Sequence, residues 1–174
     1  MASFFSKLGK HREQTLSTDG LYAYLLVRYG KRKSFHWAIA IPQDKSTVTR
    51  MDAVNKLVPP GKEIWVNQQI DETLREQPRA NVFVKIGTVQ SAQRENLKRL
   101  LAGIPLESPP EDATEPFICK VWVRHAIRLM HANGYINCPD LNALEAEIQN
   151  YGDRNEEKVL QGGSWKVHAS ARSK

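Results

Sequence analysis

The sequence predicts an α+β fold in which helices pack against a mostly antiparallel sheet. Five segments in the first half are rich in aromatic and branched residues and read as strands. In the second half the apolar residues recur at helical spacing. Strands followed by helices are typical of this layered architecture, and 174 residues with 41% hydrophobic content suffice for one core.

The strands are separated by residues that interrupt sheets. The clearest alternation is FHWAIAI at residues 35–41, where bulky residues alternate with His36 and two alanines. Gly30 and the basic run after it predict a turn before this strand, and Pro42 ends it. The tandem Pro59-Pro60 followed by a glycine predicts another break. The expected strands are residues 21–29, 35–41, 46–54, 63–70 and 81–89.

Three helices are expected after these strands, over residues 92–103, 119–134 and 141–152. Ser91 is a candidate cap for the first helix, and Gly134 is a natural end for the second. The predicted organisation is a single domain over residues 21–152. A flexible arm over residues 1–20 precedes it, and a polar, basic tail over 153–174 follows.

The charge distribution and the apolar runs of the sequence argue against nucleic-acid-binding and membrane-spanning proteins. The formal charge is +6, but it is divided between a basic turn at 28–33 and a basic tail at 158–174, with acidic segments between them. No recognition motif accompanies these clusters, so no specific nucleic-acid partner is expected. No apolar run reaches the roughly 20 residues of a membrane span, and the first residues lack the features of a secretory signal. A cytoplasmic protein is therefore expected.

Neither a cofactor nor a metal is expected. The sequence has no phosphate loop and no glycine-rich dinucleotide fingerprint. Its only cysteines, Cys119 and Cys138, are too few for a disulfide framework and lack the paired spacing of zinc ligands.

Cys119 is the first candidate for chemistry because of its position. It lies in the first turn of a predicted helix, shortly after the helix breaker Pro116. The exposed N–H groups of a helix start carry positive partial charge, which stabilises a thiolate. A lone cysteine is nevertheless more often a small buried hydrophobe.

His36 and Asp52 are the candidate base and orienting carboxylate. If strands 35–41 and 47–54 form a hairpin around residues 42–46, positions whose numbers sum to about 88 face each other. His36 would then lie directly opposite Asp52, with the Cβ atoms about 5 Å apart. A nucleophile, a base and an orienting acid together form the logic of a catalytic triad. Each residue alone could be structural.

The remaining candidates are weaker. His125 and His131 lie on the predicted helix of Cys119, one on a different face and the other too far along the axis. Cys138 follows the end of that helix without an obvious base, so a structural role is favoured. Trp37 and Trp122 are the residues best placed to contact a substrate, although both also fit a core position.

Two segments carry a family resemblance. YGKRKSFHWAIAI, followed about eighty residues later by ICKVWVRHAIRLM, resembles the circularly permuted branch of papain-like thiol enzymes. Its relatives include NlpC-like hydrolases and the lecithin:retinol acyltransferase group. The latter carries an H-W-G-like strand and a later N-C-E-H-F helix start, and the similar segments here are H-W-A at 36–38 and I-C-K-V-W at 118–122. Across about residues 20–150 the layout also resembles a family of small fungal proteins of unassigned activity.

The resemblance implies a permuted papain-like core with Cys119, His36 and Asp52 as its triad. Lys120 and Val121 depart from the polar pair that follows the acyltransferase cysteine, and Asp52 stands where many relatives carry a second histidine. The first hypothesis is a cysteine-dependent hydrolase, acyltransferase or cyclase that acts on a small-molecule, acyl or peptide substrate. The alternative is a catalytically silent binding module on the same fold.

Overall fold

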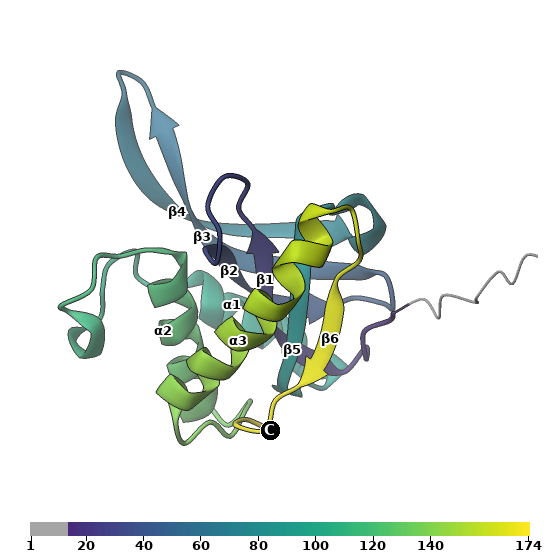
Figure 1. The fold of residues 1–174 in the computed structure, drawn as a ribbon. Helices are drawn as coiled ribbons and strands as arrows, with labels where there is room; N and C mark the ends of the chain where they lie inside the picture. Colours follow the sequence, from purple (N-terminus) through teal and green to yellow (C-terminus); the bar gives the residue numbers. More distant parts are fainter. Residues whose placement is uncertain (1–13) are drawn as a thin grey trace, which may run out of the picture.

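Residues 14–174 are described by a computed structural model, whose centre is a six-stranded sheet (Figure 1). The strand order is β4-β3-β2-β1-β5-β6, and only the β5–β6 pair is parallel. The predicted α+β class and the mostly antiparallel sheet are therefore confirmed. The strands are β1 (Gly20–Val27), β2 (Phe35–Pro42), β3 (Thr47–Val58), β4 (Lys62–Thr73), β5 (Ala80–Thr88) and β6 (Lys166–Ala169).

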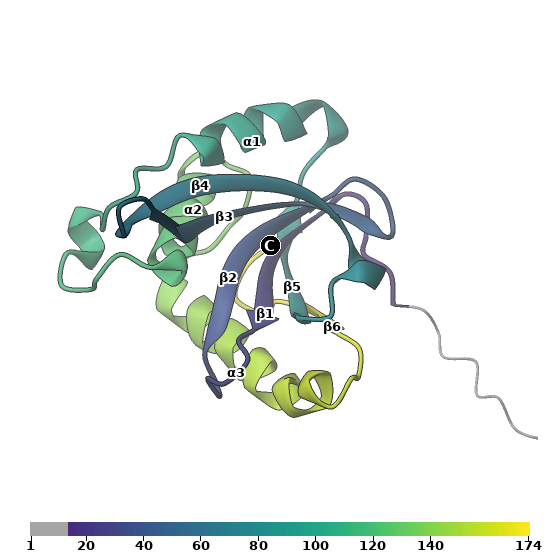
Figure 2. The ribbon, with the colours of Figure 1, turned by 90° about the horizontal axis from the view of Figure 1, so that it is seen from above.

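Three helices accompany the sheet, namely α1 (Arg94–Ala102), α2 (Cys119–Ala132) and α3 (Leu141–Leu160). The sheet is strongly curved, with α1 near its β4 end and α3 near β1 and β5 (Figure 2). The prediction that Ser91 caps the first helix is wrong, because Ser91 begins a short 3₁₀ turn and the α-helix starts only at Arg94. Gly134 ends α2 as expected, with a positive φ of 75°.

Alternation along β2 separates two cores. The bulky residues, such as Trp37 and Ile39, face the helices in the main core. Ala38 and Ala40 face the other side of the sheet, where they pack in a second cluster with Tyr24 and Phe83. The small alanine side chains leave room for these aromatic rings.

β2 and β3 pair over a short length and then separate. Their ladder runs from Pro42 opposite Val48 to Ile39 opposite Met51. The residue numbers of paired positions sum to 90 and not to the expected 88, so the predicted register was wrong by two residues. Beyond this ladder β3 continues with β4 as a long hairpin that projects from the sheet (Figure 1). The result is a fork between β2 and β3, and His36 and Asp52 lie on its two arms.

The C-terminal segment is not a tail. α3 continues eight residues beyond the predicted end, and β6 extends the sheet beside β5. The polar side chains there have specific partners, since Asn155 donates to the Asn81 carbonyl at 2.9 Å and Glu156 accepts from the Lys33 N–H at 2.8 Å. Of the predicted arm, residues 1–13 lie outside the described part, whereas Leu16 is buried in the second core.

Candidate active site

The N-terminus of α2 packs against β2 and β3 and brings Cys119 to the fork. Ile118 occupies the N-cap with an extended φ of −144° and makes no capping hydrogen bond through its side chain. Residues of this kind are among the poorest caps, so the helix start is left with its partial positive charge uncompensated by a cap. The Cys119 sulfur lies at this point and is also hydrogen-bonded to the Trp37 backbone N–H.

His36 joins Cys119 to Asp52. Its Nε2 lies 2.6 Å from Oδ2 of Asp52, and its imidazole is also hydrogen-bonded to Cys119. The three predicted residues are therefore brought together, although His36 and Asp52 are not ladder partners. Their hydrogen bond spans the fork, with His36 three residues and Asp52 one residue beyond the last β2–β3 pair.

The surroundings of Cys119 and His36 favour the charged forms of both side chains, although burial opposes them. Burial disfavours the Cys119 thiolate, but the hydrogen bond and charge of His36, the Trp37 N–H and the charge of Arg28 together lower the pKa of this thiol. Burial likewise disfavours the His36 imidazolium, yet the hydrogen bonds to Asp52 and Cys119 raise the pKa of the imidazole above its ordinary value. The two shifts favour a thiolate–imidazolium pair.

Asp52 is fully buried and is held by a second cation. Nε of Arg50 lies 3.0 Å from Oδ2 of Asp52, and Nη1 of Arg50 lies 2.7 Å from Oε2 of Glu72 on β4. Arg50 precedes Asp52 by two residues, so both side chains lie on the same face of β3. That spacing is the sequence signal that could have identified Arg50.

Arg28 is a further functional candidate that sequence reasoning missed. It follows β1, and its Nη2 lies 3.2 Å from the Cys119 sulfur. In the sequence it belongs to the basic turn of residues 28–33. Within that turn, Arg32 pairs with Glu156 and Glu157 of α3, whereas Arg28 reaches the thiol. Only the folded chain separates these two roles.

Comparison with known proteins places the chain in a family. A family model matches residues 19–165, which include Cys119, His36 and Asp52. The chain belongs to DUF6914, a family of unknown function. No curated protein and no solved structure has significant similarity to the chain.

A cleft of about 610 Å³ opens beside the fork. Its walls come from the β3–β4 hairpin, the first part of β2 and the residue before the cysteine, and they include His36, Trp65 and Ile118. Trp37 and Trp122, which the sequence singled out, are 4% and 1% exposed and belong to the main core. Trp65 is the tryptophan of the cleft, and its ring packs edge-on against Phe117 at 5.2 Å.

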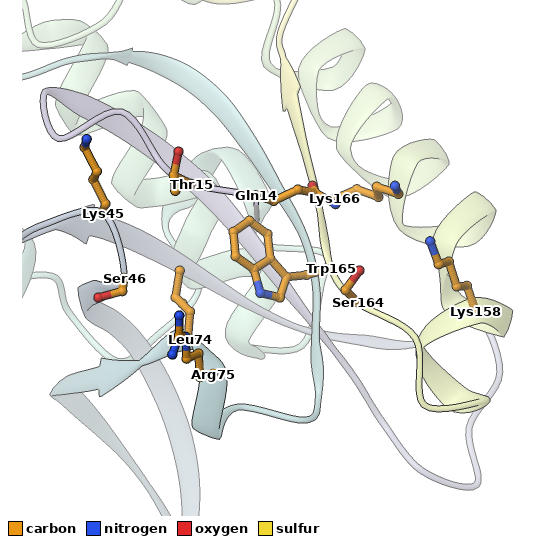
Figure 3. A pocket seen from close by; sticks show the side chains of 10 residues that line it. All are labelled: Gln14, Thr15, Lys45, Ser46, Leu74, Arg75, Lys158, Ser164, Trp165 and Lys166. Carbon is orange, nitrogen blue, oxygen red and sulfur yellow. The ribbon is translucent and has the colours of Figure 1, made fainter. Parts of the chain in front are cut away.

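A larger pocket of about 830 Å³ lies elsewhere, around Trp165 (Figure 3). Trp165 packs against Phe83 of the second core at 5.1 Å, and the other described lining residues include Lys45, Lys158 and Lys166. None of its described lining residues is a cysteine, a histidine or a carboxylate. Size alone therefore does not make it the better candidate for covalent chemistry.

The second cysteine lacks an activating environment. Burial raises the pKa of the Cys138 thiol, and its backbone N–H donates to Nδ1 of His131 at 3.2 Å. His131 thus contacts the backbone of Cys138. Among residues 14–174, no cluster of side chains suited to hold a metal ion occurs. In the same range no helix has the length and apolarity to cross a membrane.

Proposed function

We propose that the protein is a cysteine-dependent acyl-transfer enzyme with a permuted papain-like core. The hydrogen-bonded series Cys119, His36 and Asp52 carries the proposal, since it joins a nucleophile, a base and an orienting carboxylate. Both strand residues precede the helix residue along the chain. That order agrees with the permuted branch, which the sequence resembles.

The first half of the reaction forms a thioester. The Cys119 thiolate attacks the carbonyl carbon of an amide, ester or thioester, and the carbonyl electrons move to oxygen. Backbone N–H groups at the start of α2 are the donors best placed to stabilise this oxyanion. When the tetrahedral intermediate collapses, the leaving group departs with the proton of the His36 imidazolium, and the acyl group stays on sulfur.

The second half releases the acyl group. A water, an amine or a nucleophile within the substrate gives its proton to His36 and attacks the thioester. The sulfur leaves as the thiolate, which restores the ion pair. Hydrolysis, transfer and cyclisation share this intermediate and differ only in the second nucleophile. A thiol of this kind must stay reduced, which the cytoplasm favours.

A silent binding module is the second candidate, and burial of the sulfur favours it. Cys119 is 2% exposed and does not itself line the cleft. The neighbouring Ile118 and Arg28 do line it, so a substrate reaches the sulfur only if one of these side chains moves. Burial that persists in solution would protect the thiol from reagents.

Site-resolved alkylation of the native protein separates the two candidates. Iodoacetamide is expected to modify Cys119 faster than Cys138, and His36→Ala is expected to slow modification of Cys119 alone. His125→Ala is the matched control, because His125 lies on α2 without a contact to the thiol. Modification only at Cys138, or a rate at Cys119 that does not depend on His36, would overturn the enzyme proposal.

A further inference from the structure

The cleft beside Cys119 is lined by three arginines and by no acidic side chain. Arg28, Arg50 and Arg79 share its wall with His36, and the remaining lining residues are apolar or amides. An acyl substrate that enters the cleft therefore meets an excess of positive charge.

The charge of one arginine is already compensated. Arg50 is 7% exposed and pairs with Asp52 and Glu72, so it is a structural part of the wall. Arg28 and Arg79 are half-buried, and within residues 14–174 neither forms an ion pair with a carboxylate. The net positive charge of the cleft comes from these two guanidinium groups.

The backbone holds the two segments side by side. The N–H of Val27, the residue before Arg28, donates to the carbonyl of Arg79 at 2.9 Å. The segment that follows β1 is thus tied to the residue that precedes β5, and both side chains face the cleft. Of the two arginines, Arg28 is the one that contacts the Cys119 sulfur.

A guanidinium without a carboxylate partner in a half-buried cleft is a binding site for an anionic oxygen group. Its fork of donors matches the oxygens of a carboxylate or a phosphate, and the low dielectric of the cleft strengthens the interaction. Trp65 and Ile118 supply apolar surface for the rest of a ligand.

Resting on the acyl-transfer function, we propose that the enzyme selects acyl substrates that carry an anionic oxygen group beside the reacting carbonyl. Arg79 binds this group, while Arg28, which lines the same cleft, contacts the sulfur. When the group binds, Arg28 turns from the thiolate toward the substrate and exposes Cys119. The same arginines thus account for both the charge of the cleft and the covered sulfur.

Two alkylating agents of similar size test this selection. Iodoacetate is anionic and iodoacetamide is neutral, and in both the Cys119 thiolate displaces iodide. The ratio of the iodoacetate to the iodoacetamide rate constant at Cys119 is compared with the ratio for free glutathione. We expect the ratio at Cys119 of the native protein to be about tenfold higher than the ratio for glutathione, because a positively charged cleft concentrates the iodoacetate anion.

Arg79→Gln is expected to lower this ratio toward that of glutathione. Arg154→Gln, which removes an exposed positive charge of α3 outside the cleft, is the matched control and keeps the native ratio. Circular dichroism and thermal unfolding establish that both variants are folded. A native ratio equal to that of glutathione, or a ratio that Arg79→Gln leaves unchanged, would overturn the proposal.

Protection identifies the anionic group. Succinate and inorganic phosphate are each added before iodoacetamide, and slower modification of Cys119 by one of them assigns the group as a carboxylate or a phosphate. Protection by neither contradicts the proposal. Failure of the acyl-transfer function has a different signature, since the iodoacetamide rate would then not depend on His36.

Discussion

Nε2 of His36 lies 2.6 Å from Oδ2 of Asp52 across a fork between two strands that have already stopped pairing. The bond is therefore held by side chains and not by the sheet ladder. Arg50 holds the carboxylate from one side, while the start of α2 places Cys119 against the imidazole. The site depends on the separation of β2 and β3, which lets a helix on one face of the sheet reach a histidine on the other.

Removing the charge of Asp52 is expected to weaken the thiolate. In Asp52→Asn the imidazolium of His36 loses its anionic partner, so its pKa falls and the Cys119 thiol is less ionised. The rate of iodoacetamide modification near neutral pH is expected to drop by about tenfold, equivalent to one pKa unit. Asp71→Asn is the control, because it removes an exposed carboxylate that accepts a hydrogen bond from Thr49. Within the described part of the chain, this carboxylate makes no hydrogen bond or ion pair with His36 or the thiol. Equal rates in the native protein and Asp52→Asn would remove Asp52 from the proposed triad.

Arg50 is expected to support the fold as well as the site. Arg50→Met leaves the buried carboxylate of Asp52 and the mostly buried carboxylate of Glu72 without their shared cation. Breaking a buried pair in this way should lower the free energy of unfolding by about 3 kcal/mol. Urea denaturation measures the change, and Lys56→Met, at an exposed position of the same strand, should cost little. A urea denaturation midpoint of Arg50→Met equal to that of the native protein would show that Arg50 does not stabilise the fold through these carboxylates.

Asp112 is expected to make the free energy of unfolding depend on pH in the acidic range. Hydrogen bonds from Arg128 and, with a smaller effect, from Arg124 lower the pKa of this carboxyl from 3.8 to about 2. Because the pKa is lower in the folded state, the ionised carboxylate stabilises the fold at pH values above its unfolded-state pKa. This stabilisation is lost as the pH falls from about 4 to 2. The contribution at neutral pH is on the order of 2 kcal/mol.

Asp112→Asn is the test of that contribution. The variant should be less stable than the native protein at pH 7, and the difference should shrink as the pH falls toward 2. The loop before Cys119 is anchored to α2 through these contacts, so the variant should also show faster hydrogen exchange in residues 105–118. A stability difference that stays constant down to pH 2 would contradict the assigned ionisation.

The strands and the positions of His36 and Cys119 at the start of elements could be predicted because their signals are local. The alternation in residues 35–41 marks β2, and the breaker before Cys119 marks a helix start. The register could not be predicted from loop length, because the side chain of Asp44 shapes the turn. Its Oδ1 accepts from the N–H groups of Ser46 and Thr47, both at 2.7 Å, and the ladder shifts by two residues.

Arg28, Arg79 and Trp65 could not be predicted because their roles arise from tertiary contacts. Arg28 and Arg79 are 51 positions apart, and the hydrogen bond from the Val27 N–H to the Arg79 carbonyl holds their segments together. Trp65 reaches the cleft because its hairpin leaves the sheet. The C-terminal segment was misread for a related reason. Polar residues such as Asn155 are buried there, because partners elsewhere in the chain satisfy them.

The central claim is that His36 and Cys119 form a reactive ion pair, and titration of the thiolate tests it most directly. In a Cys138→Ser background, the ultraviolet absorbance of the thiolate is followed against pH, with Cys119→Ser to identify the signal. We predict that Cys119 ionises below the pKa of about 8.5 of an ordinary thiol, and that His36→Ala moves its midpoint upward. A midpoint at or above the ordinary value, unchanged in His36→Ala, would contradict the account.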